Sequence, residues 1–296
     1  MRKNTIFKGM ATAMVTPMTA TGVDYDALGR FIDFQLASGI NALVAVGTTG
    51  ESATLSPQER NEVIRFTVDR VNGRVPVIAG TGTNNTAHAI TYTENACAIG
   101  ADAMLVVTPY YNKATQAGLI AHFSAIADKS DKPVMLYNVP SRTGCNMLPA
   151  TVAELAKHPN IAAIKEASGN MAQIVELFAR CGDQIDVYSG EDAITIPMMA
   201  MGAKGAISVL SNVVPAQSVA MTDAFFAGKL EEAARLQCTY LDLINDLFCE
   251  VSPAPAKAAV SAMGYGEENI RLPLIPMSQE NRQRMFERMR RLGVNV

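Results

Sequence analysis

Residues 42–71 read ALVAVGTTGESATLSPQERNEVIRFTVDRV. The segment opens with a short apolar run, which is typical of a strand buried on both faces of a parallel sheet. A glycine-rich turn follows, and then Ser56 and Glu59 form a capping box, with Pro57 in the first helical turn. Apolar residues recur at helical spacing behind the box. The segment therefore predicts one strand–helix unit.

The same unit recurs along the chain. Seven further apolar runs lie at 13–15, 75–79, 103–107, 134–137, 161–164, 185–188 and 206–210. Helical patterns follow at 25–38, 86–99, 116–129, 149–157, 170–180, 191–201 and 213–226. Eight strands, each followed by a helix, predict an α/β fold of the (β/α)8 TIM-barrel type. A doubly wound open sheet is the alternative, but it would normally show fewer strands and a Gly-rich fingerprint after the first one.

The strand–helix rhythm stops after Gly228. We therefore expect a catalytic barrel over 1–228 and a small all-helical C-terminal domain over 229–296. Two helices are expected in this domain, marked by apolar residues at helical spacing: Leu236, Tyr240, Leu243 and Leu247, then Met285, Met289 and Leu292. Pro253 and Pro255 are expected to break the chain between them, and the arginines of the last helix to form a solvated face.

Composition excludes several classes of protein. Of 296 residues, 25 are Lys or Arg and 28 are Asp or Glu, so the net charge of −3 argues against a nucleic-acid partner. No run approaches the length of a membrane helix, and the N-terminal segment lacks a signal-peptide core. Five cysteines without a Cys-x-x-Cys pair predict reduced thiols. We therefore expect a cytoplasmic protein without a membrane or nucleic-acid partner.

Reactive groups of such barrels lie where the strands end. Lys165 directly follows the apolar run 161–164, and Tyr137 ends the neighbouring run. An ordinary lysine at the start of a loop reaches water, and that is the plainer interpretation. At pH 7 only about one part in 2,500 of such an amine is unprotonated, so a nucleophilic lysine needs desolvation. A strand end in a barrel mouth supplies desolvation, so Lys165 is a candidate Schiff-base nucleophile and Tyr137 a candidate proton shuttle.

Two loops carry groups that could bind an anion, and no motif indicates a cofactor. The turn GTTG at 47–50 offers backbone N–H groups for a carboxylate or phosphate, although a plain tight turn is an equal alternative. Arg142 could clamp a carboxylate, although many arginines simply lie on the surface.

The histidines, His88, His122 and His158, lie away from the strand ends. Neither a catalytic metal nor a nucleotide cofactor is therefore expected.

Six motifs occur in order along the chain: GTTGE at 47–51, TPYYNK at 108–113, YNVPSRTG at 137–144, IKEASG at 164–169, SGED at 189–192 and GAISVLSN at 205–212. With them the chain resembles the pyruvate-dependent class I aldolases, the family that includes dihydrodipicolinate synthase and N-acetylneuraminate lyase. The resemblance implies a metal-independent barrel lyase that usually assembles as a homotetramer, a dimer of dimers. Arg142 favours pyruvate and L-aspartate 4-semialdehyde as substrates, at the branch point of diaminopimelate and lysine biosynthesis. A sialic acid or keto-deoxy sugar acid aldolase is the alternative.

The resemblance also implies the catalytic roles. Lys165 would condense with pyruvate to an imine, whose enamine attacks the aldehyde of the second substrate. Tyr137, Thr49 and Tyr111 would relay protons to solvent, with Tyr111 supplied by the neighbouring subunit. A barrel that only senses a small molecule is a third interpretation, but it would not need a nucleophile with a proton relay.

The substrate-binding roles rest on the same resemblance. Thr48 and Thr49 would hold the pyruvate carboxylate, in agreement with the anion-binding turn inferred from the glycines. Arg142 would bind the carboxylate of the semialdehyde. Gly190 and the carbonyl of Ile207 would line the pocket.

Regulation departs from the family pattern. Members inhibited by lysine bind it at positions that correspond here to Ser52, Ala53, Asn84 and Tyr110. The sensitive bacterial forms carry a carboxylate at the position of His88 and histidines at those of Pro57 and Arg60. Because His88 and Arg60 make the pocket neutral or positive, we expect weak or absent inhibition by lysine. Cys145, in the Arg142 loop, is expected to be a packing cysteine without a redox role.

Overall fold

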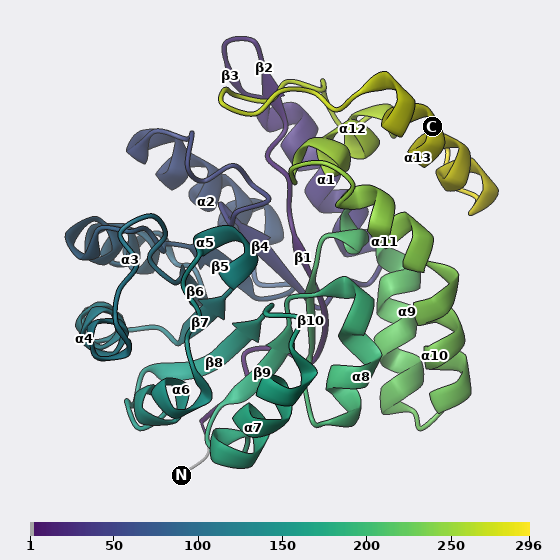
Figure 1. The fold of residues 1–296 in the computed structure, drawn as a ribbon. Helices are drawn as coiled ribbons and strands as arrows, with labels where there is room; N and C mark the ends of the chain where they lie inside the picture. Colours follow the sequence, from purple (N-terminus) through teal and green to yellow (C-terminus); the bar gives the residue numbers. More distant parts are fainter. Residues whose placement is uncertain (1–2) are drawn as a thin grey trace.

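The computed structural model describes residues 3–296. At its centre eight parallel strands form a closed barrel, in the order β1-β10-β9-β8-β7-β6-β5-β4 (Figure 1). The strands are β1 (Gly9–Ala13), β4 (Ala42–Ala45), β5 (Val77–Gly80), β6 (Ala103–Val107), β7 (Val134–Asn138), β8 (Ile161–Glu166), β9 (Asp186–Ser189) and β10 (Gly205–Ser208). The barrel closes because β1 pairs with both β10 and β4. The predicted (β/α)8 barrel is confirmed.

Helices surround the barrel on its outer face. They are α1 (Tyr25–Ala37), α2 (Pro57–Val71), α3 (Thr86–Ile99), α4 (Gln116–Ala127), α6 (Pro149–Leu155), α7 (Met171–Cys181), α8 (Thr195–Ala200) and α9 (Pro215–Phe226). Three short turns of helix stand in the loops: α5 (Pro140–Thr143), η1 (Asp192–Ile194) and η2 (Leu210–Asn212). The capping box of Ser56 and Glu59 is present at the start of α2. None of the helices in the described part of the chain is long and apolar enough to cross a membrane.

The first strand lies earlier than predicted. It spans Gly9–Ala13, whereas the apolar run suggested 13–15. Thr12 interrupts the apolar pattern, yet it is fully buried because its hydroxyl bonds Gln35 Oε1 at 2.6 Å and Ser211 Oγ at 2.8 Å. A search for apolar runs therefore misses a strand such as β1, which contains a buried, hydrogen-bonded polar residue. A small hairpin outside the barrel, β2 (Met18–Thr19) with β3 (Gly22–Val23), was also not predicted.

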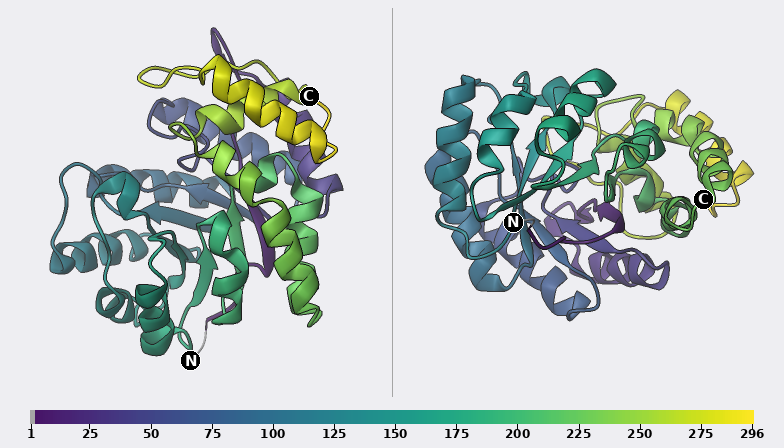
Figure 2. Two further views of the ribbon diagram at one scale, coloured as in Figure 1. Left: turned by 45° about the vertical axis from the view of Figure 1, so that its right-hand side comes forward. Right: turned by 90° about the horizontal axis from the view of Figure 1, so that it is seen from below.

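The C-terminal segment is helical, as expected, but contains two more helices than the sequence suggested. It forms α10 (Leu230–Thr239), α11 (Leu241–Leu247), α12 (Ala254–Ala262) and α13 (Gln279–Arg291), which gather on one side of the barrel (Figure 2). Pro255 does not break the chain but lies in the first turn of α12, where a missing N–H costs nothing. The arginines of α13 are not merely solvated, since Arg284 and Arg288 both bind the buried carboxylate of Asp246 on α11.

Side chains fill the interior of the barrel and close its N-terminal end. Phe7, just before β1, stacks on Tyr188 with ring centroids 4.3 Å apart, and the Tyr188 hydroxyl donates to the Phe7 carbonyl at 2.6 Å. Both side chains belong to an apolar cluster inside the barrel, which is distinct from the larger cluster between strands and helices. The packed lower part leaves the C-terminal ends of the strands as the place for a site.

Candidate active site

Lys165 and Tyr137 meet at the C-terminal ends of adjacent strands. The two residues are register partners on β8 and β7. Both side chains are buried, Lys165 with 5% and Tyr137 with 6% of its surface exposed. The Lys165 Nζ lies 4.4 Å from the centre of the Tyr137 ring. The plainer interpretation of Lys165, a lysine that reaches out to water, therefore does not describe this side chain.

The space beside Lys165 depends on Gly190. A Cβ placed on Gly190 would lie 2.9 Å from both Cγ and Cε of Lys165 and 2.8 Å from the Cβ of Ala167. Contacts this short would displace the lysine. The absence of a side chain at residue 190 thus helps to keep open a cavity of about 240 Å³. The cavity is lined by Thr48, Thr49, Tyr137, Val139, Ser141, Arg142, Lys165, Ala167, Gly190, Glu191, Val209, Phe248, Glu250, Val251 and Ser252.

Burial makes Lys165 a better nucleophile. Desolvation lowers the pKa of its ammonium to about 8, assisted by the positive charge of Arg142 and opposed by the carboxylates of Asp192 and Glu191. With such a pKa about a tenth of the amine is unprotonated at pH 7, about 250 times more than for a solvated lysine. The group thus meets the chemical requirement for attack on a carbonyl.

Asp192 is the carboxylate that most strongly opposes deprotonation of Lys165, and sequence reasoning missed it. It is buried at the start of η1, where its Oδ2 accepts from the backbone N–H groups of Val209 and Leu210, both at 2.9 Å. Burial raises its pKa, and these hydrogen bonds lower it. The signal available in the sequence was the pair of acids directly after β9, in the SGED motif.

Tyr137 carries a protonated phenol inside the cavity. Burial is the largest cause that raises the pKa of its phenol, to about 12, so the hydroxyl keeps its proton at neutral pH. Its hydrogen-bond partner is the side chain of Thr48. Thr49, the relay member that the resemblance implies, is buried and also lines the cavity.

Two predicted site residues lie outside this cavity. Tyr111 is 91% exposed, has a left-handed backbone with φ of 69°, and does not line the cavity of its own chain. The side chain of Ile207 belongs to the apolar cluster inside the barrel, and Val209, two residues further on, lines the cavity. The single chain therefore leaves the predicted hydroxyl relay without its third member.

Arg142 stands at the mouth of the cavity. It lies on α5, is exposed, and donates from Nη1 to the carbonyl of Ser252 at 3.2 Å. Ser252 precedes α12, so the C-terminal segment forms one wall of the mouth together with Phe248 and Val251. A guanidinium held by a backbone carbonyl at an open mouth can bind an incoming carboxylate.

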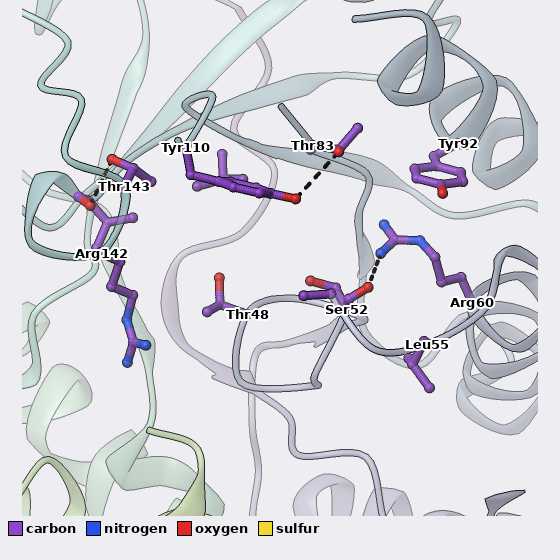
Figure 3. A pocket seen from close by; sticks show the side chains of 13 residues that line it. Thr48, Ser52, Leu55, Arg60, Thr83, Tyr92, Tyr110, Arg142 and Thr143 are labelled. Atoms are coloured by element: carbon purple, nitrogen blue, oxygen red, sulfur yellow. Dashed lines mark hydrogen bonds between the residues drawn. The ribbon is translucent and has the colours of Figure 1, made fainter. Parts of the chain in front are cut away.

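A second cavity of about 300 Å³ adjoins the first (Figure 3). Thr48, Val139 and Arg142 line both cavities. Of the residues predicted to form a lysine site, Ser52, Ala53 and Tyr110 line the second cavity, together with Arg60. Asn84 and His88 are not among its lining residues; His88 lies exposed on α3, and Asn84 accepts from Asn112 through its carbonyl at 2.9 Å.

Metal ligands do not gather anywhere in the described chain. Among residues 3–296, no three His, Cys, Asp or Glu side chains come close enough together to hold a metal ion. The polar groups of the first cavity are an amine, hydroxyls, a guanidinium and the carboxylates of Glu191 and Glu250.

A desolvated lysine beside a protonated tyrosine, at the carboxyl end of a (β/α)8 barrel, defines the class of lysine-nucleophile barrel enzymes. The comparison with known families makes this specific. Residues 6–291 match the model of the dihydrodipicolinate synthetase family, and the chain belongs to that family.

Curated relatives and solved structures agree with this assignment. The chain is 53% identical to the 4-hydroxy-tetrahydrodipicolinate synthase of Geobacter sulfurreducens over 280 residues, 95% of this chain and 97% of the relative. It superposes on the crystal structure of dihydrodipicolinate synthase from Aquifex aeolicus with a TM-score of 0.96, at 43% identity and covering 98% of this chain and 99% of that one. The chloride-inhibited enzyme from Acinetobacter baumannii, solved with pyruvate, gives 0.95 at 41% identity, covering 98% and 100%.

Proposed function

We propose that the chain condenses pyruvate with L-aspartate 4-semialdehyde to 4-hydroxy-tetrahydrodipicolinate, the branch-point step of diaminopimelate and lysine biosynthesis, through an imine on Lys165. The observation that carries the proposal is the buried amine of Lys165, with its lowered pKa, in a cavity that Gly190 keeps open. Relatives at about half identity bear the name of this synthase, which supports the assignment.

The geometry fits imine chemistry. The free amine of Lys165 attacks the ketone of pyruvate, and the Tyr137 hydroxyl protonates the oxygen that leaves as water. Loss of a methyl proton gives the enamine, whose carbon forms a bond to the aldehyde carbon of the second substrate, while the aldehyde oxygen takes up a proton and becomes the 4-hydroxyl group. The amine of that substrate then attacks the imine carbon, closes the ring and releases Lys165. Thr48 and Thr49 hold the carboxylate of pyruvate throughout.

Arg142 selects the second substrate in this proposal. Its position at the mouth supports binding of the semialdehyde carboxylate, whereas a sugar substrate would call for hydroxyl-binding groups at that place. The test compares turnover of pyruvate with L-aspartate 4-semialdehyde and with N-acetylmannosamine. We expect turnover with the semialdehyde only. Turnover of pyruvate with N-acetylmannosamine but not with the semialdehyde would contradict this proposal and support the sugar-aldolase alternative.

We further propose that the chain works in the cytoplasm as a homotetramer, a dimer of dimers, with a barrel over 1–228 and a helical domain over 229–296. The exposed, left-handed Tyr111 supports an assembly in which it enters the site of a neighbouring subunit. There it would complete the relay from Tyr137 and Thr49 to solvent. The five unpaired cysteines suit a reducing compartment.

Lysine is expected to inhibit this enzyme weakly. Arg60 lines the second cavity, and its positive charge repels the lysine ammonium. At pH 8 we expect that half-inhibition requires more than about 1 mM lysine, which corresponds to less than about 4 kcal/mol of binding free energy. Steady-state rates with increasing lysine measure this. Arg60→Gln removes the repulsion and should make inhibition stronger; tight inhibition of the unmodified enzyme would contradict the prediction.

A further inference from the structure

Glu166 is a buried carboxylate that takes no part in the imine chemistry. On β8 it follows Lys165 directly, and it is the register partner of Asn138 on β7. Because successive side chains of a strand point to opposite faces, Glu166 points away from the cavity that Lys165 lines. Glu166 is 1% exposed and Asn138 is fully buried. Buried polar groups need partners, so the contacts of this carboxylate indicate its role.

Both oxygens of the Glu166 carboxylate accept hydrogen bonds. Its Oε1 accepts from the backbone N–H of Ser168 at 2.7 Å, and its Oε2 accepts from the side-chain amide of Asn138 at 3.0 Å. Burial raises the pKa of the Glu166 carboxyl, and these hydrogen bonds lower it. An ionised carboxylate only accepts, so the nitrogen of the Asn138 amide has to face Glu166 and the amide oxygen has to face the other way.

The Asn138 amide closes the Arg142 loop, residues 139–146. Its Oδ1 accepts from the backbone N–H of Met147 at 2.9 Å, and its Nδ2 donates to Oδ1 of Asn146 at 3.0 Å. Asn146 in turn exchanges two hydrogen bonds with Gln173 of α7, at 2.8 and 3.1 Å. The base of the loop is therefore tied to β7, β8 and α7 by side chains, and the loop carries α5 with its arginine.

We propose that Glu166 is a positioning residue for Arg142: it orients the Asn138 amide, which holds the Arg142 loop and thereby the guanidinium at the mouth of the cavity. The hydrogen bond from this guanidinium to the Ser252 carbonyl is long, at 3.2 Å, so the loop backbone has a large share in its placement. The inference rests on the proposed function in one respect, the binding of the semialdehyde carboxylate by Arg142.

Glu166→Gln tests the proposal because it keeps the shape of the side chain and leaves one acceptor oxygen. In either orientation of the new amide, its N–H groups face those of Ser168 or of Asn138, and one hydrogen bond is lost. We expect the KM for L-aspartate 4-semialdehyde to rise about tenfold, and the KM for pyruvate and the rate of borohydride trapping to change less than about twofold. Glu176→Gln is the matched control, because Glu176 is exposed and pairs with Arg180 on the same helix.

Two double variants distinguish positioning of Arg142 from a general loss of packing. Asn138→Asp alone sets two carboxylates against each other. Combined with Glu166→Gln it places a donor opposite an acceptor again, and the KM for the semialdehyde should return most of the way. In an Arg142→Gln background, Glu166→Gln should raise this KM little further, because both changes act through the same guanidinium.

Hydrogen exchange measures the hold on the loop without any substrate. In Glu166→Gln we expect the backbone amides of residues 139–147 to exchange about tenfold faster than in the unmodified chain, and those of the swapped double variant to be slow again. Thermal melting checks that each variant is folded. If Glu166→Gln does not fold, the swapped double variant decides: recovery of the fold and of the KM supports the proposal, and failure to recover them overturns it.

Three results with folded variants would overturn the proposal. They are an unchanged KM for the semialdehyde in Glu166→Gln, a full additive rise of that KM in the Arg142→Gln background, and unchanged exchange over residues 139–147. Failure of the proposed function would appear differently, as no turnover of the semialdehyde by the unmodified chain. The exchange measurement then still decides whether Glu166 holds the Arg142 loop.

Discussion

Replacing Lys165 by methionine is expected to abolish turnover, with kcat reduced about 10⁴-fold or more, because the covalent intermediate can no longer form. The same variant should give no adduct after incubation with pyruvate and borohydride, whereas the unmodified chain should carry a reduced pyruvyl group on Lys165. Mass spectrometry of peptides from the digested protein identifies the lysine that carries the adduct. Lys157→Met is the matched control, since Lys157 is exposed and forms an ion pair with Glu154 beside it.

The rate of trapping should also follow the pKa of Lys165. Because burial lowers that pKa to about 8, the fraction of free amine rises almost tenfold per pH unit below pH 7, reaches about half at pH 8 and at most doubles above it. A solvated lysine would instead gain free amine up to a pH of about 10. An adduct on another lysine, a pyruvyl adduct in Lys165→Met, or a trapping rate that rises steadily to pH 10 would each contradict the assignment of Lys165 as nucleophile.

The barrel could be predicted from sequence because parallel strands covered by helices are apolar on both faces. Runs such as 103–107 and 161–164 are therefore visible without any tertiary information. The first strand was misplaced because Thr12 is buried through partners that lie 23 and 199 residues away. Helix α12 was missed because prolines were interpreted as breaks, although Pro255 occupies a first helical turn.

The reactive pair was predictable for a related reason. Lys165 and Tyr137 each follow an apolar run directly, and the ends of parallel strands converge at one end of a barrel. The backbone hydrogen bonds that hold the Asp192 carboxylate, and the two carbonyls that bind the buried guanidinium of Arg60, were not predictable. Each depends on a turn geometry or on a contact between loops, which leaves no periodic signal in the sequence.

The ion pair between Glu51 and Lys257 is another contact between distant segments that the sequence pattern does not reveal. Glu51, in the turn that carries Thr48, has a left-handed backbone with φ of 58° and forms an ion pair with Lys257 of α12. Both side chains are 2% exposed. The second carboxylate oxygen of Glu51 accepts from the backbone N–H of Arg271 at 3.2 Å. Burial is the largest cause that lowers the pKa of Lys257, and the Glu51 carboxylate opposes it.

Replacing Lys257 by methionine is therefore expected to destabilise the fold strongly. The change leaves the Glu51 carboxylate buried without its cation, and loss of one partner of a buried pair costs about 3–5 kcal/mol. The double variant Lys257→Met with Glu51→Gln removes the stranded charge as well and should recover part of that loss. Urea unfolding measures the free energy of unfolding in each case.

The exposed pair of Lys229 and Glu232 supplies the control, and the active site supplies a second readout. Lys229→Met should change the free energy of unfolding by less than about 1 kcal/mol, because exposed pairs contribute little.

Since Glu51 shapes the turn that carries Thr48, Lys257→Met should also raise the KM for pyruvate at temperatures where the variant remains folded. A Lys257→Met protein as stable as Lys229→Met would show that water or another cation reaches Glu51. An unchanged KM in a destabilised variant would show that the pair anchors α12 without positioning the pyruvate-binding turn.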